Sequence, residues 1–243
     1  MQNWSDPRTT TAATPDIAVG VPRVARDAGL RSYMLSVYNY MASGVLLTGI
    51  VALLFANSGM AAQVMQTPLK WLIMFAPLAF VMVMSFGMNR LSTGTLQLLF
   101  WAFATTMGLS MSTIFLVYTG ASIATTFFAV SAAFLGLSLY GYTTKKDLSG
   151  FGTFLIMGVV GIFVAMVINL FLQSSVLNLA ISAIGVLLFA GLTAYDTQKI
   201  KSMYAHVAGT DMMGKVVIMG ALNLYLDFIN MFSFLLQFMG DRR

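Results

Sequence analysis

Long apolar runs alternate with short polar links along most of the chain. Seven of these runs reach the roughly 20 residues that an α-helix needs to cross a bilayer core about 30 Å thick. The pattern predicts membrane-spanning helices at Tyr33–Ala56, Leu69–Met88, Leu96–Tyr118, Ala121–Tyr142, Phe151–Leu172, Val176–Tyr195 and Val216–Met239. No heptad or solenoid repeat is visible, so we expect residues 31–243 to form one all-α domain of seven transmembrane helices.

Residues 1–30 differ from the rest of the chain because they contain three prolines, three arginines and no long apolar run. Such a segment has too little apolar surface to bury, and it predicts a flexible cytoplasmic tail. Without an apolar core it is not expected to be a cleavable signal peptide. The first apolar run then acts as the insertion signal.

The composition excludes a soluble domain, because 58% of the residues are hydrophobic and only 9% are charged, against about 25% charged residues in soluble domains. The chain has no cysteine and one histidine, which excludes disulfides, thiolate catalysis and a histidine metal cluster. No hydrolytic constellation is visible, so we expect neither an enzyme nor a resident cofactor.

Lysines and arginines favour one orientation of the seven spans. With the first residues in the cytoplasm, ten basic residues fall on the inner side and three on the outer side, which is a strong positive-inside bias. The net charge of +5 is therefore assigned to basic loops, and no nucleic-acid partner is expected. An odd number of spans places Arg242 and Arg243 outside, although a re-entrant last segment is the alternative that would return them to the cytoplasm.

Asp227 is the only acid well inside any predicted span. Asn223 and Asn230 lie four residues before it and three residues after it, so all three share one face of a helix. A polar face on an otherwise apolar membrane helix must meet protein or water, because a charge in lipid is costly. We expect an ion site or a polar pathway here; a protonated or paired carboxyl that only holds helices together is the alternative.

Two further charged residues border the spans. Asp196 ends the sixth run with Lys199 as its i+3 partner, and Arg90 closes the second run. A straight last helix places Asp227 about 16 Å from its cytoplasmic end, while Asp196 is expected at the membrane surface. The spacing alone therefore does not bring the two acids together.

Three segments give the chain a specific resemblance to a known family. Ala194–Ile200, Leu224–Asn230 and Lys145–Ser149 resemble motifs of the bacterial branch of the Bax inhibitor-1 family, and the likeness extends over about residues 33–240. It implies a last helix at the centre of the bundle, surrounded by the other six, and a pH-sensitive calcium leak across the membrane.

The same resemblance implies roles for individual residues. The acids matching Asp196 and Asp227 form a hydrogen-bonded pair that faces the cytoplasm, and Arg90 matches an arginine that latches onto Asp196. Some calcium-conducting members carry a glutamate about three turns before that arginine, where this chain has Ala79 or its neighbours; the chain contains no glutamate.

These observations lead to a passive, proton-modulated calcium leak channel as the first functional hypothesis. Asp196 and Asp227 sense protons and contact Ca²⁺ weakly, Arg90 is the latch, and Asn223 and Asn230 line the pathway. The expected partners are the lipid bilayer, Ca²⁺ and protons, in a bacterial plasma (inner) membrane with the N-terminus cytoplasmic. The alternatives are a regulatory protein that binds a membrane partner, such as a quality-control protease, and a proton-coupled carrier.

Overall fold

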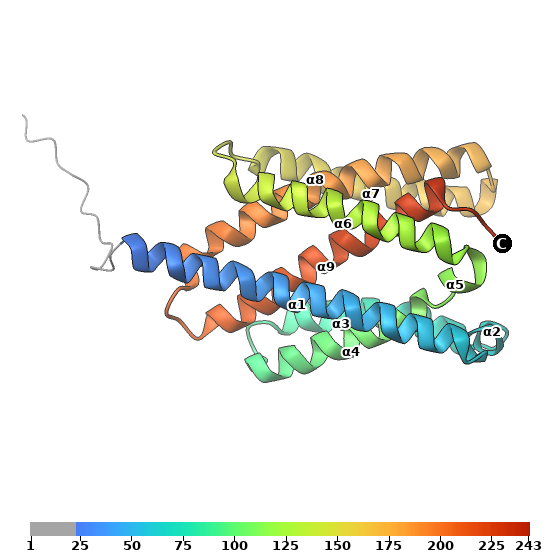
Figure 1. The fold of residues 1–243 in the computed structure, drawn as a ribbon, viewed down its shortest axis with the longest axis horizontal. Helices are drawn as coiled ribbons and strands as arrows, with labels where there is room; N and C mark the ends of the chain where they lie inside the picture. Colours follow the sequence, from blue (N-terminus) through green and yellow to red (C-terminus); the bar gives the residue numbers. More distant parts are fainter. Residues whose placement is uncertain (1–22) are drawn as a thin grey trace, which may run out of the picture.

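The structure of the protein is a computed structural model in which residues 23–243 are described. These residues form nine α-helices and no β-strand (Figure 1). The helices are α1 (Arg23–Asn57), α2 (Met60–Met65), α3 (Leu69–Gly87), α4 (Thr93–Met111), α5 (Ile114–Val117), α6 (Gly120–Thr143), α7 (Ser149–Leu172), α8 (Ser175–Val207) and α9 (Met212–Met239). Seven segments are long and apolar enough to cross a membrane, with α4 and α5 counted as one, which confirms the predicted fold class.

Several helix ends differ from the predicted ones. Helix α1 begins at Arg23, so residues 23–30 are helical although they were expected in the tail; residues 1–22 of that tail lie outside the described part of the chain. The predicted end of the sixth span at Tyr195 is wrong by twelve residues, because α8 continues to Val207.

The extension of α8 has a clear cause in the sequence. Its apolar side chains recur at helical spacing, at Ile200, Met203, Tyr204 and Val207, and pack on the core. Lysines and other polar residues lie between them and lower the average hydropathy of the segment. A search for uniformly apolar runs therefore stops before the amphipathic part of the helix begins.

Helix α9 lies at the centre of the bundle. In its most apolar window 72% of the residues are buried, against 39% for α8 and 11% each for α3 and α7. It packs on α8, α1, α6 and α4, while α3 packs on α4 and α7 on α8. In Figure 1 α9 runs obliquely between the other helices. The expected central position of the last helix is therefore confirmed.

Helix α9 crosses the whole bundle, and the chain leaves it at the end opposite to the start of α1 (Figure 1). The residues that follow pair with the link between α5 and α6: the Thr119 amide donates to the Asp241 carbonyl at 3.0 Å, and the Arg243 amide donates to the Val117 carbonyl at 2.9 Å. The Arg242 guanidinium lies 5.9 Å from the centre of the Tyr118 ring. A re-entrant last segment is thus not what the structure adopts.

Helices α6 and α8 approach each other closely at Gly141. A Cβ atom on this residue would overlap the backbone carbonyl of Ala194, so only glycine allows the contact. One turn away, the hydroxyl groups of Ser138 and Thr197 are hydrogen-bonded at 3.2 Å. The two contacts fix α6 against the turn of α8 that carries Asp196.

Replacement of the glycine tests this contact. Gly141→Ala is expected to destabilise the protein by about 1–3 kcal/mol, because the added methyl group meets backbone atoms that cannot rotate away. Gly136→Ala in the same helix is the matched control, since a Cβ atom there meets nothing within 4 Å. Thermal unfolding in detergent measures both variants, and equal midpoints would contradict the close approach of the two helices.

Candidate functional site

The side chains of Asp196 and Asp227 meet where α8 packs on α9. The two carboxyl groups lie close enough for each to act on the protonation of the other, and two carboxyl groups that share a site do not both ionise easily. Asp227 is only 4% exposed, and Asp196 is partly buried. The structure therefore brings together the two acids that the spacing of the predicted spans kept apart.

The extra length of α8 explains how the pair forms. Asp196 lies eleven residues before the end of α8 at Val207, about 16 Å along the helix, rather than at a helix end. Asp227 lies fifteen residues after the start of α9 at Met212, about 22 Å along that helix. Only residues 208–211 separate the two antiparallel helices, so the carboxyl groups reach similar depths.

One oxygen of the pair has no protein partner. Asp227 Oδ2 is buried, and no hydrogen bond reaches it from any described residue. A buried polar atom without a partner carries a desolvation penalty of a few kcal/mol, and such atoms are rare in folded proteins. This oxygen is therefore still able to accept a hydrogen bond.

The two asparagines on the same helix, Asn223 and Asn230, form no hydrogen bond with either carboxyl group among the described residues. The Asn230 amide nitrogen donates to the Leu226 carbonyl of its own helix at 2.8 Å, and Asn223 is partly exposed. Within the described residues, no group of three or more histidines, cysteines or acids is placed to hold a metal ion. Two carboxyl groups supply four oxygens, fewer than the six to eight ligands of a resident Ca²⁺ ion.

The cation that acts on Asp196 in this structure is Lys199, one turn further along α8. Arg90 is exposed in the turn between α3 and α4, and it is not among the groups that act on either carboxyl. The reason lies in the packing of α3, which rests on the outer side of α4 and makes no extensive contact with α8. The Arg90 latch therefore stays a prediction.

A second polar contact, which the sequence pattern did not reveal, fixes the other side of α9. The hydroxyl groups of Tyr225 and Thr48 are 2.6 Å apart, and the Thr48 hydroxyl also donates to the Ala104 carbonyl at 2.8 Å. Both side chains are buried, and they tie α9 to α1 and α4. Since Tyr225 is two residues from Asp227 on a helix, it holds the face opposite to the acid pair.

These features define a seven-span helical membrane protein whose central helix carries a buried acid. Residues 30–243 match the family described as Inhibitor of apoptosis-promoting Bax1. The chain is 47% identical over 220 residues to the Inner membrane protein YbhL of Escherichia coli, covering 89% of this chain and 94% of the relative. It is 50% identical over 219 residues to RP147 of Rickettsia prowazekii, covering 89% and 92%.

The chain therefore belongs to the Bax inhibitor-1 family. The match begins near the point where α1 enters the bundle and extends through all seven spans. The resemblance carried by the two aspartate motifs and by Lys145–Ser149 is thereby confirmed at the level of the family.

Removal of the Tyr225 hydroxyl tests the contact on the far side of α9. Tyr225→Phe is expected to lower stability by about 0.5–1.5 kcal/mol, because a buried hydrogen bond is lost. Thr48→Val should act on the same contact, so the double variant should lose less than the sum of the single losses. Tyr140→Phe on the exposed face of α6 is the control, and strict additivity of the two buried changes would contradict the contact.

Proposed function

We propose that this protein is a pH-sensitive calcium (cation) leak channel in which Asp196 and Asp227 form the proton-sensing and ion-contacting site. The observation that supports this most directly is the meeting of Asp196 of α8 with the buried Asp227 of the central helix, where Asp227 Oδ2 has no hydrogen-bond partner among the described residues. An acid retained at such a position in a membrane protein usually serves a proton or ion pathway. The proposal includes no enzymatic activity and no resident cofactor.

Protons and Ca²⁺ compete for the same oxygens in this proposal. Two carboxyl groups that share a site do not ionise independently, so the pair exchanges protons as a unit. When the pair is ionised it attracts a divalent cation, which prefers oxygen ligands; when it is protonated that attraction is lost. The small number of ligands suits an ion that passes through rather than one that stays.

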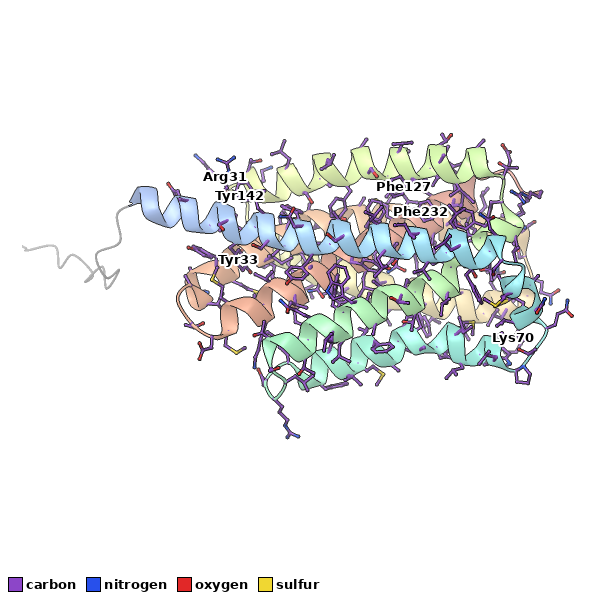
Figure 2. The ribbon with its side chains drawn as sticks, turned by 60° about the horizontal axis from the view of Figure 1, so that its bottom comes forward. Arg31, Tyr33, Lys70, Phe127, Tyr142 and Phe232 are labelled. Carbon is purple, nitrogen blue, oxygen red and sulfur yellow. The ribbon has the colours of Figure 1, made fainter. Side chains whose placement is uncertain are left out.

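The proposed location is a bacterial plasma membrane, with the start of α1 on the cytoplasmic side. The basic residues support this orientation, since Arg31, Arg90 and most lysines lie toward that end of the bundle. Figure 2 shows Arg31 at the end where α1 begins and Lys70 at the opposite end. A relative in Escherichia coli is named an inner membrane protein.

Flux through liposomes that contain only the purified protein tests the site. Asp227→Asn is expected to abolish the pH dependence of Ca²⁺ flux, because an amide cannot exchange a proton or carry a negative charge. Asp211→Asn, which makes the same chemical change in the link between α8 and α9, is the control and should retain the wild-type profile.

An unchanged profile in Asp227→Asn would remove the site assignment. If the wild-type protein itself carried no flux, the leak proposal would fail. The alternative of a regulatory protein that binds a membrane partner would then be the one to pursue.

A second measurement asks which cation controls Asp196. A cation beside a carboxylate opposes its protonation, so Lys199→Gln should move the midpoint of the flux profile to higher pH. Arg90→Gln is measured in parallel, because the predicted latch requires that it also moves the profile. A shift in Lys199→Gln alone would assign the control to Lys199, and no shift in either variant would contradict both assignments.

A further inference from the structure

A polar pocket of 300 Å³ opens at the end of the bundle where α6 is linked to α7. Three lysines line it: Lys145 and Lys146 come from the link, and Lys199 comes from α8. Hydroxyl and amide groups complete its polar wall, at Ser149, Gln198 and Ser202. We call this site the lysine pocket. The proposed leak activity uses only Lys199 from it, so the pocket as a whole has no role yet.

The backbone that carries the lysines is held in place by Gln198. Its amide nitrogen donates to the Lys146 carbonyl at 2.7 Å, and its amide oxygen accepts from the Leu148 nitrogen at 2.9 Å. The Lys201 ammonium donates to the Tyr142 carbonyl at 2.6 Å, at the end of α6. These bonds fix the link before any ligand arrives, which reduces the entropy lost on binding.

The single acid of the pocket is already engaged. Asp147 Oδ1 accepts a hydrogen bond from the Ser149 amide at 2.9 Å, at the start of α7. Hydrogen bonds from the Ser149 side chain and backbone hold the pKa of Asp147 below its usual value, so it stays ionised. Its carboxylate therefore serves the helix terminus, and the lining of the pocket contains three lysines and one aspartate. The excess of positive charge suits an anion.

The position of the pocket identifies the source of that anion. It lies where α6 ends at Thr143 and α7 begins at Ser149, which is the level of lipid headgroups beside two membrane-spanning helices. Tyr142, which Figure 2 places near the same end as Arg31, packs under the Lys201 ammonium at 4.8 Å from the ring centre. Tyrosines and lysines at this level are typical of a membrane interface, and basic pockets between helices there bind anionic headgroups.

We propose that the lysine pocket binds the phosphate group of an anionic membrane lipid. Lys145, Lys146 and Lys199 supply the positive charge. Lysine ammonium groups act as compact point charges that attract phosphate without demanding a fixed orientation. This binding does not depend on the leak activity.

The test measures lipid binding directly, with the full-length protein in a neutral detergent. Native mass spectrometry follows the titration of phosphatidylglycerol onto the wild type and onto Lys145→Gln/Lys146→Gln. Loss of two lysines is expected to weaken binding about tenfold or more, because each basic residue near a headgroup contributes substantially. The control Lys70→Gln/Lys215→Gln removes the same charge outside the pocket and should change binding by less than about twofold.

A second variant adds negative charge to the lysine pocket instead of removing positive charge. Ser202→Glu places a carboxylate in the pocket from α8 and should also weaken lipid binding, by repulsion of the phosphate. The thermal unfolding midpoint of each pocket and control variant is measured as well. A midpoint equal to that of the wild type shows that the variant is folded.

Three results would overturn the proposal. Equal losses in the pocket and control variants would show attraction by net charge alone. Equal affinity for phosphatidylcholine would show that the anionic headgroup is not recognised. Displacement of the lipid by inorganic phosphate at matching concentration would assign the pocket to a soluble anion.

Discussion

An ionisable side chain that faces hydrocarbon costs about 2.5–3.5 kcal/mol on insertion scales, and this penalty organises the whole bundle. Asp227 sits in the middle of a helix that is otherwise apolar, so the helix that carries it must be enclosed by protein. The described structure meets that requirement by placing α9 at the centre, where most of its residues are buried. The other spans leave large apolar side chains exposed, such as Phe86 and Phe171, because the bilayer solvates them.

The contact between α8 and α9 then determines what Asp227 meets. Helix α8 continues as a single element past Asp196, and small residues allow its neighbours to approach. Gly141 of α6 lies against the backbone of α8, and Gly220 of α9 leaves room for the Ile200 side chain. Small residues at helix contacts are typical of membrane bundles, where packing has to replace the hydrophobic effect. The acid pair is a product of this packing, since the helices set the distance between the carboxyl groups.

The number and order of the membrane-spanning helices could be read from the sequence, because lipid exposure demands apolar residues over a fixed length. Asp227 could be singled out for the same reason, as the one acid inside a span. Its partner Asp196 could not be identified from the spacing, because the contact depends on the length and register of α8. Lys199 and Lys201 lower the mean hydropathy of this part of α8, so the predicted span ends too early. Family resemblance, rather than spacing, indicated the pair.

Other features depended on packing that no periodicity encodes. Thr48 is one of many hydroxyl residues in the spans, and nothing in its neighbourhood marks it as the partner of Tyr225. Lys199 lies more than fifty residues from Lys145 and Lys146 along the chain, and Gln198 binds the link that carries these two lysines to α8. The position of Arg90 follows from the outer placement of α3, which depends on how α3 packs against α4.

The central position of α9 also has a consequence for biosynthesis. Chains emerge from the ribosome in order, and earlier segments fold first. The first six spans are therefore synthesised before α9, the helix around which they are arranged. Until α9 is added, Thr48 lacks its partner Tyr225 and Asp196 lacks its partner Asp227. The bundle can therefore reach its final packing only after the last of its seven spans has been added.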